Sequence, residues 1–93
     1  MFKWLNKTGV ESDRGFAVQS VDRFTIDYVE GVKRISVYVE PGLQAGKPCV
    51  NIQSTSFARW DGESTDLPLD RQKQMSANFI EAMEFQGIDV LVG

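Results

Sequence analysis

Two segments in the middle of the chain alternate apolar with mostly polar side chains. In residues 24–29 every second position carries a large apolar side chain, and in residues 34–40 the odd-numbered positions are Ile or Val. A period of two is typical of a strand that buries one face. Gly31 lies between the segments and can adopt the positive φ of a tight turn. The pattern therefore predicts a β-hairpin, and it places Tyr38 on the polar face.

Three further segments have the apolar content and the flanking breakers of strands. Residues 1–15 are the least patterned, and we expect them to dock as a short strand or single turn, to fray, or to rest weakly on a membrane surface. Glycine and proline predict a loop over residues 41–48, and small polar residues predict a second loop over 60–66. The strands are predicted at residues 16–21, 49–57 and 88–92.

After the second loop the period changes to that of a helix. Apolar positions recur every three to four residues, which predicts an amphipathic helix over residues 70–86. Asp70 is predicted as its N-cap and Gly87 as its left-handed C-terminal cap. The sum is one α+β domain over residues 1–93, an antiparallel meander of four to five strands with a single late helix packed on its apolar face. The predicted helix stripe consists of Met75, Phe79, Ala82, Met83 and Gln86.

The composition fits one small globular core and removes several kinds of chemistry. The chain has 93 residues, of which 42% are hydrophobic and 25% charged. It contains no histidine, which excludes Ser-His-Asp and Cys-His relays and His-containing zinc sites. The single cysteine, Cys49, excludes an internal disulfide, and we interpret it as a small apolar filler. No signal peptide and no apolar run of about 20 residues is present, which favours a soluble cytoplasmic protein.

Asp61, Glu63 and Asp66 gather in the second loop and invite comparison with a paired-acid hydrolase. A loop of small polar residues offers no apolar pocket to raise a carboxyl pKa and no rigid element to fix a separation. The spacing also differs from that of a calcium-binding EF-hand loop. We therefore expect no enzymatic activity, no metal and no cofactor, and we interpret the loop as a solvated surface or a protein contact.

The charges are unevenly distributed along the chain. Residues 1–59 carry eight Lys or Arg against six acids, a charge of +2, whereas residues 60–93 carry two against seven, a charge of −5. The net charge of −3 argues against a nucleic-acid-binding face. The acidic C-terminal third includes Glu81 and Glu84 of the predicted helix. It is either a solvated face or a surface that steers toward a basic protein, such as a nuclease domain.

Trp60 stands between the predicted strand 49–57 and the acidic loop. A tryptophan in such a place covers the edge of a core or anchors an interface, since Trp, Tyr and Arg are enriched at binding hot spots. Arg59 beside it can stack on or near the indole ring. Both interpretations of Trp60 stay open at the level of sequence.

Four short motifs follow one another along the chain: Tyr28–Gly31, Ile35–Glu40, Ser56–Trp60 and Ala82–Ile88. In this order they resemble the Immunity protein 74 family, small bacterial immunity proteins of polymorphic-toxin and contact-dependent inhibition systems. The resemblance covers about residues 24–92, and residues 1–15 fall outside it. Asp61-Gly62 after the tryptophan departs from the more proline-rich loop of the family.

The resemblance implies a protein that binds a toxin domain made by a neighbouring or sibling cell and performs no reaction itself. Its partner would be the cognate toxin domain rather than a nucleic acid, a membrane or a small-molecule substrate. The alternative is a generic interaction module or an accessory subunit of a larger complex. With the charge distribution, the resemblance leads us to expect contacts from Trp60, Asp61, Glu63 and Asp66, more weakly from Glu81 and Glu84, and otherwise from the polar sheet face of Arg34, Ser36 and Tyr38.

Overall fold

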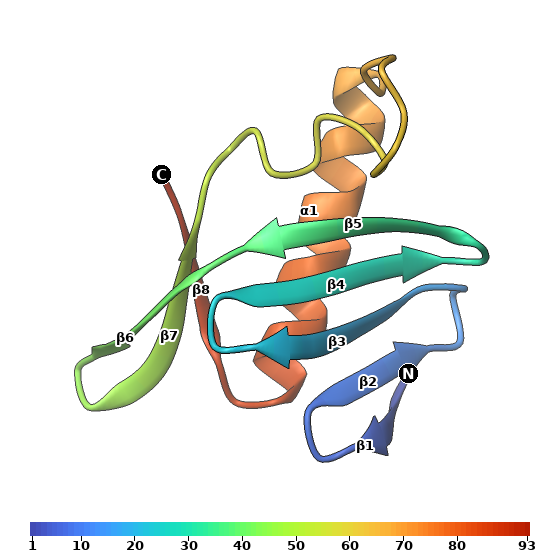
Figure 1. The fold of residues 1–93 in the computed structure, drawn as a ribbon. Coiled ribbons are helices and arrows are strands. Elements are labelled where there is room, and N and C mark those ends of the chain that lie inside the picture. Colours follow the sequence, from blue (N-terminus) through green and yellow to red (C-terminus); the bar gives the residue numbers. More distant parts are fainter.

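The computed structural model describes all of residues 1–93 and has an α+β fold, as predicted (Figure 1). It contains two sheets and a single late helix, α1 (Leu69–Phe85). Sheet A is a five-stranded antiparallel meander of β1 (Phe2–Asn6), β2 (Gly9–Ser12), β3 (Ala17–Asp22), β4 (Thr25–Glu30) and β5 (Lys33–Tyr38). Sheet B consists of β6 (Glu40–Gln44), β7 (Lys47–Ile52) and β8 (Asp89–Val92).

The hairpin of β4 and β5 forms as the alternating pattern predicts. Glu30 and Lys33 are opposite each other, and a two-residue turn joins them. Gly31 has a φ of 60° and is the only one of the two turn residues with a positive φ, which is the geometry of a type II′ turn. The inner face of the hairpin is buried, and Tyr38 lies on the outer face with 58% of its surface exposed. The hairpin therefore gives the sheet one apolar and one polar face.

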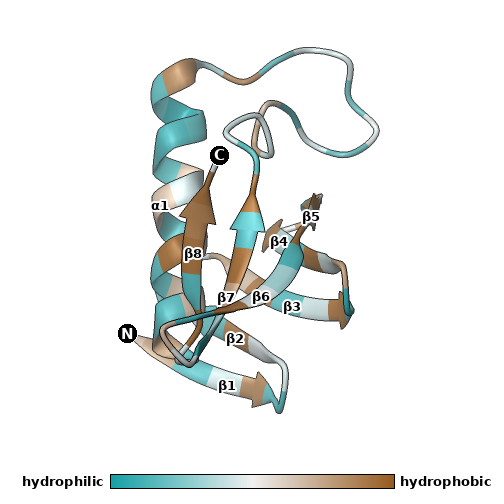
Figure 2. Ribbon diagram, turned by 90° about the vertical axis from the view of Figure 1, so that its left-hand side faces the viewer, coloured by the Kyte–Doolittle hydropathy of each residue, from teal (hydrophilic) through white to brown (hydrophobic).

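The core lies between the inner face of sheet A, sheet B and α1. Figure 1 shows α1 crossing behind the strands of sheet A, and Figure 2 shows it beside β8. Phe79 is fully buried and packs against Phe57, with ring centroids 5.6 Å apart. Four of the five predicted stripe positions are buried, and the fifth, Gln86, is half-buried.

The C-terminal end of α1 follows the prediction, whereas the N-terminal end does not. Gly87 has a φ of 81°; its N–H donates to the Glu84 carbonyl, and the Ile88 N–H donates to the Met83 carbonyl. This pair of hydrogen bonds is a Schellman motif. The prediction of Asp70 as N-cap is wrong, because the backbone is extended at Pro68 and helical from Leu69, so the N-cap lies two residues earlier. Asp70 instead lies inside the first turn, where its negative charge interacts favourably with the positive end of the helix dipole.

The predicted loop over residues 41–48 is wrong, since most of it forms the β6–β7 hairpin. Ala45 and Gly46 both have positive φ, at 53° and 80°, as a type I′ turn requires. Pro41 belongs to an edge strand and Pro48 lies before the first β7–β8 pair, so neither missing N–H interrupts the sheet. Proline therefore marks the margin of a sheet here rather than a loop.

The number of strands in the meander is as expected, but two of the segments that form it differ from the predicted ones. The weakly patterned N-terminal segment supplies β1 and β2, so it is docked as strands. The predicted strand 49–57 ends at Ile52 and belongs to sheet B. The final strand, β8, pairs with β7 in parallel, because α1 returns the chain to the end at which β7 began. The single helix has neither the length nor the apolar run needed to cross a membrane.

Candidate functional site

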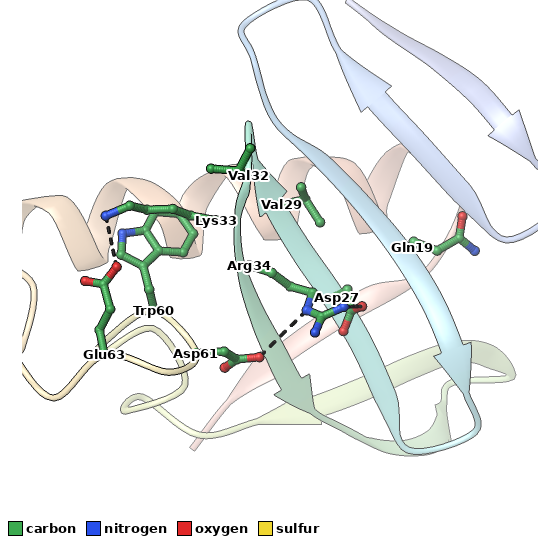
Figure 3. A pocket seen from close by; sticks show the side chains of 9 residues that line it. All are labelled: Gln19, Asp27, Val29, Val32, Lys33, Arg34, Trp60, Asp61 and Glu63. Atoms are coloured by element: carbon green, nitrogen blue, oxygen red, sulfur yellow. Dashed lines mark ion pairs between the residues drawn. The ribbon is translucent and has the colours of Figure 1, made fainter.

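An open hollow of about 690 Å³ lies where the outer face of sheet A meets the loop after β7 (Figure 3). Strands β3, β4 and β5 supply part of its lining, and the turn of the β4–β5 hairpin and the loop supply the rest. Apolar groups and charges of both signs surround it. The lining residues are Gln19, Asp27, Val29, Val32, Lys33, Arg34, Trp60, Asp61 and Glu63.

Asp61 joins the loop to the outward edge of β5 by two hydrogen bonds. Its backbone N–H donates to the Arg34 carbonyl at 2.9 Å, and its carboxylate Oδ2 accepts the Ser36 backbone N–H at 3.0 Å. A residue of a parallel strand beside Ile35 would make the same two bonds, using its own carbonyl as the acceptor. Asp61 therefore makes one parallel bridge to β5, with its carboxylate in the place of a backbone carbonyl, although the loop itself does not form a strand.

Ion pairs fix the remaining charges around the hollow. Lys33 Nζ lies 3.0 Å from the Glu63 carboxylate. The Arg34 guanidinium lies between two acids, 3.7 Å from Asp27 and 4.0 Å from Asp61. Figure 3 shows the loop acids turned toward the basic side chains of β5. Exposed pairs such as these add less than about 1 kcal/mol each to stability, so their effect is chiefly to orient the loop.

Trp60 covers the edge of the core. Only 6% of its surface is exposed, and its ring stacks on Tyr28 with centroids 6.4 Å apart and planes 23° apart. Its remaining surface contributes to the wall of the hollow. Arg59 does not lie over the indole but pairs with Asp66 at 2.9 Å. The structure therefore favours the core-edge interpretation of Trp60.

The six predicted contact residues do not form one surface. Trp60, Asp61 and Glu63 meet at the hollow, whereas Asp66 is in the same loop but outside the lining. Glu81 pairs with Arg14, and Glu84 forms no ion pair. Both helix acids belong to the last turns of α1, at the end away from the loop (Figure 1).

Sequence reasoning did not single out the part of the hollow contributed by β3 and β4. Asp27 and Val29 occupy the outward positions of β4, and Gln19 is opposite Asp27 on β3. The alternating pattern contained the signal, because it assigned Asp27 to the polar face together with Arg34. What it could not supply was the contact of the loop with β5, which places Trp60, Asp61 and Glu63 beside these residues.

A separate polar network joins β4 to α1. The Tyr28 hydroxyl donates to the Glu30 carboxylate and accepts the Asn78 side-chain amide at 3.1 Å, and Arg71 pairs with Glu30. Burial raises the pKa of Tyr28 well above its ordinary value, and the bond to Glu30 raises it further. A phenol in this environment stays protonated and serves as a structural donor.

The other candidate chemistry is sparse. Cys49 is buried, and its sulfur would lie 3.7 Å from a Cβ placed on Gly42, its partner on β6. No three His, Cys, Asp or Glu side chains lie close enough together to hold a metal ion. No family model, curated protein or solved structure matches the chain.

Proposed function

We propose that this protein is a cytoplasmic immunity protein that binds a cognate toxin domain and neutralises it by direct contact. The four motifs that resemble the Immunity protein 74 family suggest the toxin as partner. The hollow beside β5 supplies a place for the contact, since α1 covers the opposite face of sheet A and leaves this one open (Figure 1).

The observation that carries the proposal is the fixed arrangement of charges around apolar groups in the hollow. Asp61 is held by two hydrogen bonds to β5, and Glu63 is held by Lys33. Side chains that are already ordered lose little conformational entropy on binding, which favours affinity. The exposed apolar surface of Val32 adds the desolvated contact that most interfaces have at their centre.

The charge pattern favours local complementarity over long-range attraction. Three acids and two bases line the hollow, and each loop acid has a basic neighbour. Asp61 and Glu63 still expose 42% and 43% of their side chains. They can therefore accept further hydrogen bonds from a partner cation, for example in the basic groove of a nuclease.

Co-expression tests the proposal. The protein is expressed with the toxin domain encoded beside it, and survival of the cells and recovery of the complex are scored. Protection together with a recovered complex supports the immunity function. Death of the cells despite stable expression, with no complex recovered, would refute it. A complex with a neighbour that is not toxic would favour the interaction module or accessory subunit instead.

A further inference from the structure

The outward edge of β5 has two hydrogen-bonding positions. The loop pairs with the backbone groups of one position and leaves those of the other without a partner. The two-residue turn makes Glu30 and Lys33 a hydrogen-bonded pair. By alternation, the backbone groups of Lys33, Ile35 and Val37 face β4, and those of Arg34, Ser36 and Tyr38 face away from the sheet. Asp61 occupies the first outward position, between Arg34 and Ser36.

The loop leaves the edge immediately after this bridge. Gly62 has a φ of 81°, and the Glu63 N–H donates back to the Trp60 carbonyl at 3.1 Å. Both features belong to a tight turn, so residues after Asp61 cannot continue along β5. The next bridge would use the Ser36 carbonyl and the Tyr38 N–H, and neither group has a backbone or side-chain partner outside the β4–β5 ladder.

The unpaired position opens onto a hollow of about 240 Å³ between β5 and the segment after β7. A second hollow of about 190 Å³ shares Tyr38 and Gln53 with the first, so the two adjoin along the strand. Figure 1 shows the segment after β7 passing alongside β5. The side chains around the first hollow are mostly amides and hydroxyls that can bond to a main chain: Ser36, Tyr38, Gln53, Thr55 and Ser56.

We infer that this groove receives an extended segment of the partner protein, which adds to β5 at Ser36 and Tyr38. The incoming N–H donates to the Ser36 carbonyl, and the incoming carbonyl accepts the Tyr38 N–H, so the segment repeats the bridge of Asp61 one step further along the strand. The inference rests on the proposed function in that the partner is a protein.

Two other edge strands, β1 and β6, are less suited to this role. β1 carries Lys3 and a register irregularity between Trp4 and Asn6, both of which discourage pairing with another strand. β6 contains Pro41 at an outward position, which removes a donor from its edge. Unpaired donor and acceptor groups next to a polar groove are found at β5.

Amide exchange measured by NMR tests the inference directly. In the free protein, the Tyr38 amide is expected to exchange fast and the Ile35 and Val37 amides slowly. The probe is an acetylated, amidated Thr-Val-Thr-Val-Thr peptide at millimolar concentration, and the control is the same peptide with a methylated central amide. The first peptide should shift the Tyr38 resonance in a saturable way and slow its exchange about tenfold at saturation. The methylated peptide should do neither.

Matched variants locate the response. Thr55→Trp fills the groove and should abolish the Tyr38 shift, whereas Leu43→Trp on the exposed β6 strand should preserve it. An unmoved Tyr38 resonance, equal effects of both peptides, or shifts confined to β1 or β6 would overturn the inference. Protection of Tyr38 that grows with protein concentration and without peptide would assign the edge to a second copy and also overturn it.

The inference and the proposed function fail separately. The peptide titration uses no toxin, so it stands or falls without the co-expression result. If cells are protected and the complex is recovered, the Tyr38 amide in that complex should be protected from exchange. Unchanged exchange there would contradict strand addition and leave the immunity function intact.

Discussion

The Asp61 carboxylate accepts the backbone N–H of Ser36, and this contact makes a loop residue part of the edge of sheet A. An exposed edge strand is a template for unwanted pairing unless it is covered. Asp61 covers one position of β5, and Lys33 and Glu63 hold the following residues of the loop beside it. The hollow therefore owes its shape to the same contacts that protect the sheet edge.

Asp61→Ala should lower the free energy of unfolding by about 1–2 kcal/mol, because it leaves the Ser36 N–H without its charged acceptor. Asp61→Asn keeps an oxygen acceptor and should lose about half as much. Denaturant unfolding measures both variants, and the Ser36 amide should exchange faster in the alanine variant. Asp66→Ala is the control, since Asp66 pairs only with the exposed Arg59 and should cost under about 0.5 kcal/mol. Equal losses at positions 61 and 66 would contradict the role of Asp61.

Phe79→Ala should destabilise the fold by about 3–5 kcal/mol, since the ring is fully buried between α1 and Phe57 and would leave a cavity. Phe85→Ala, on the same helix but 44% exposed, should cost clearly less. Thermal and denaturant unfolding distinguish the two variants. A melting-temperature change of only a degree or two for Phe79→Ala would place that ring outside the core.

Tyr28 should make the protein sensitive to alkaline pH. Its pKa in the folded state is raised above the ordinary value of 10.0, so the folded state keeps the phenolic proton after the unfolded state has released it. The stability due to this group is complete below about pH 10 and declines as the pH rises further. Tyr28→Phe should remove that part of the alkaline decline, and it should cost about 1–2 kcal/mol at neutral pH through the lost Glu30 and Asn78 bonds. Denaturant midpoints compared at about pH 8 and about pH 11 test this, and parallel profiles for the two proteins would contradict it.

Local patterns predicted the elements that depend on neighbouring residues. The period of two and Gly31 predicted the β4–β5 hairpin, and the period near 3.6 with Gly87 predicted most of α1 and its C-terminal cap. These features need only short-range sterics and one buried face. They were sufficient for the fold class.

The division into two sheets could not be predicted, because it depends on contacts far apart in the sequence. β8 pairs with β7, although the whole loop and α1 separate the two strands in the sequence. The prolines of the β6–β7 hairpin look like loop residues in the sequence, but the margin of a sheet tolerates them. The same holds for the hollow. Alternation placed Arg34 on the polar face, but only the folded chain brings Asp61 onto the edge of β5.

Val32 offers the sharpest test of the hollow as the contact surface for a partner. It is fully exposed at the tip of the β4–β5 hairpin and lines the hollow, so Val32→Glu should leave stability within about 0.5 kcal/mol. Trp60→Ala is a poorer probe, because the buried ring supports the core and its loss would unfold part of the protein. Val32→Glu should weaken binding of the toxin domain about tenfold or more, through a lost apolar contact and a desolvated charge.

Two control variants separate this surface from the alternatives, with affinity measured by titration calorimetry. Leu43→Glu makes the same kind of change at a 77% exposed position on the second hairpin and should leave the affinity unchanged. Glu84→Lys alters a helix acid distant from the hollow and should also have no effect, whereas Glu63→Lys should weaken binding because it reverses a charge in the lining. If Glu84→Lys weakens binding and Val32→Glu does not, the partner contacts the helix, and the hollow is not the interface.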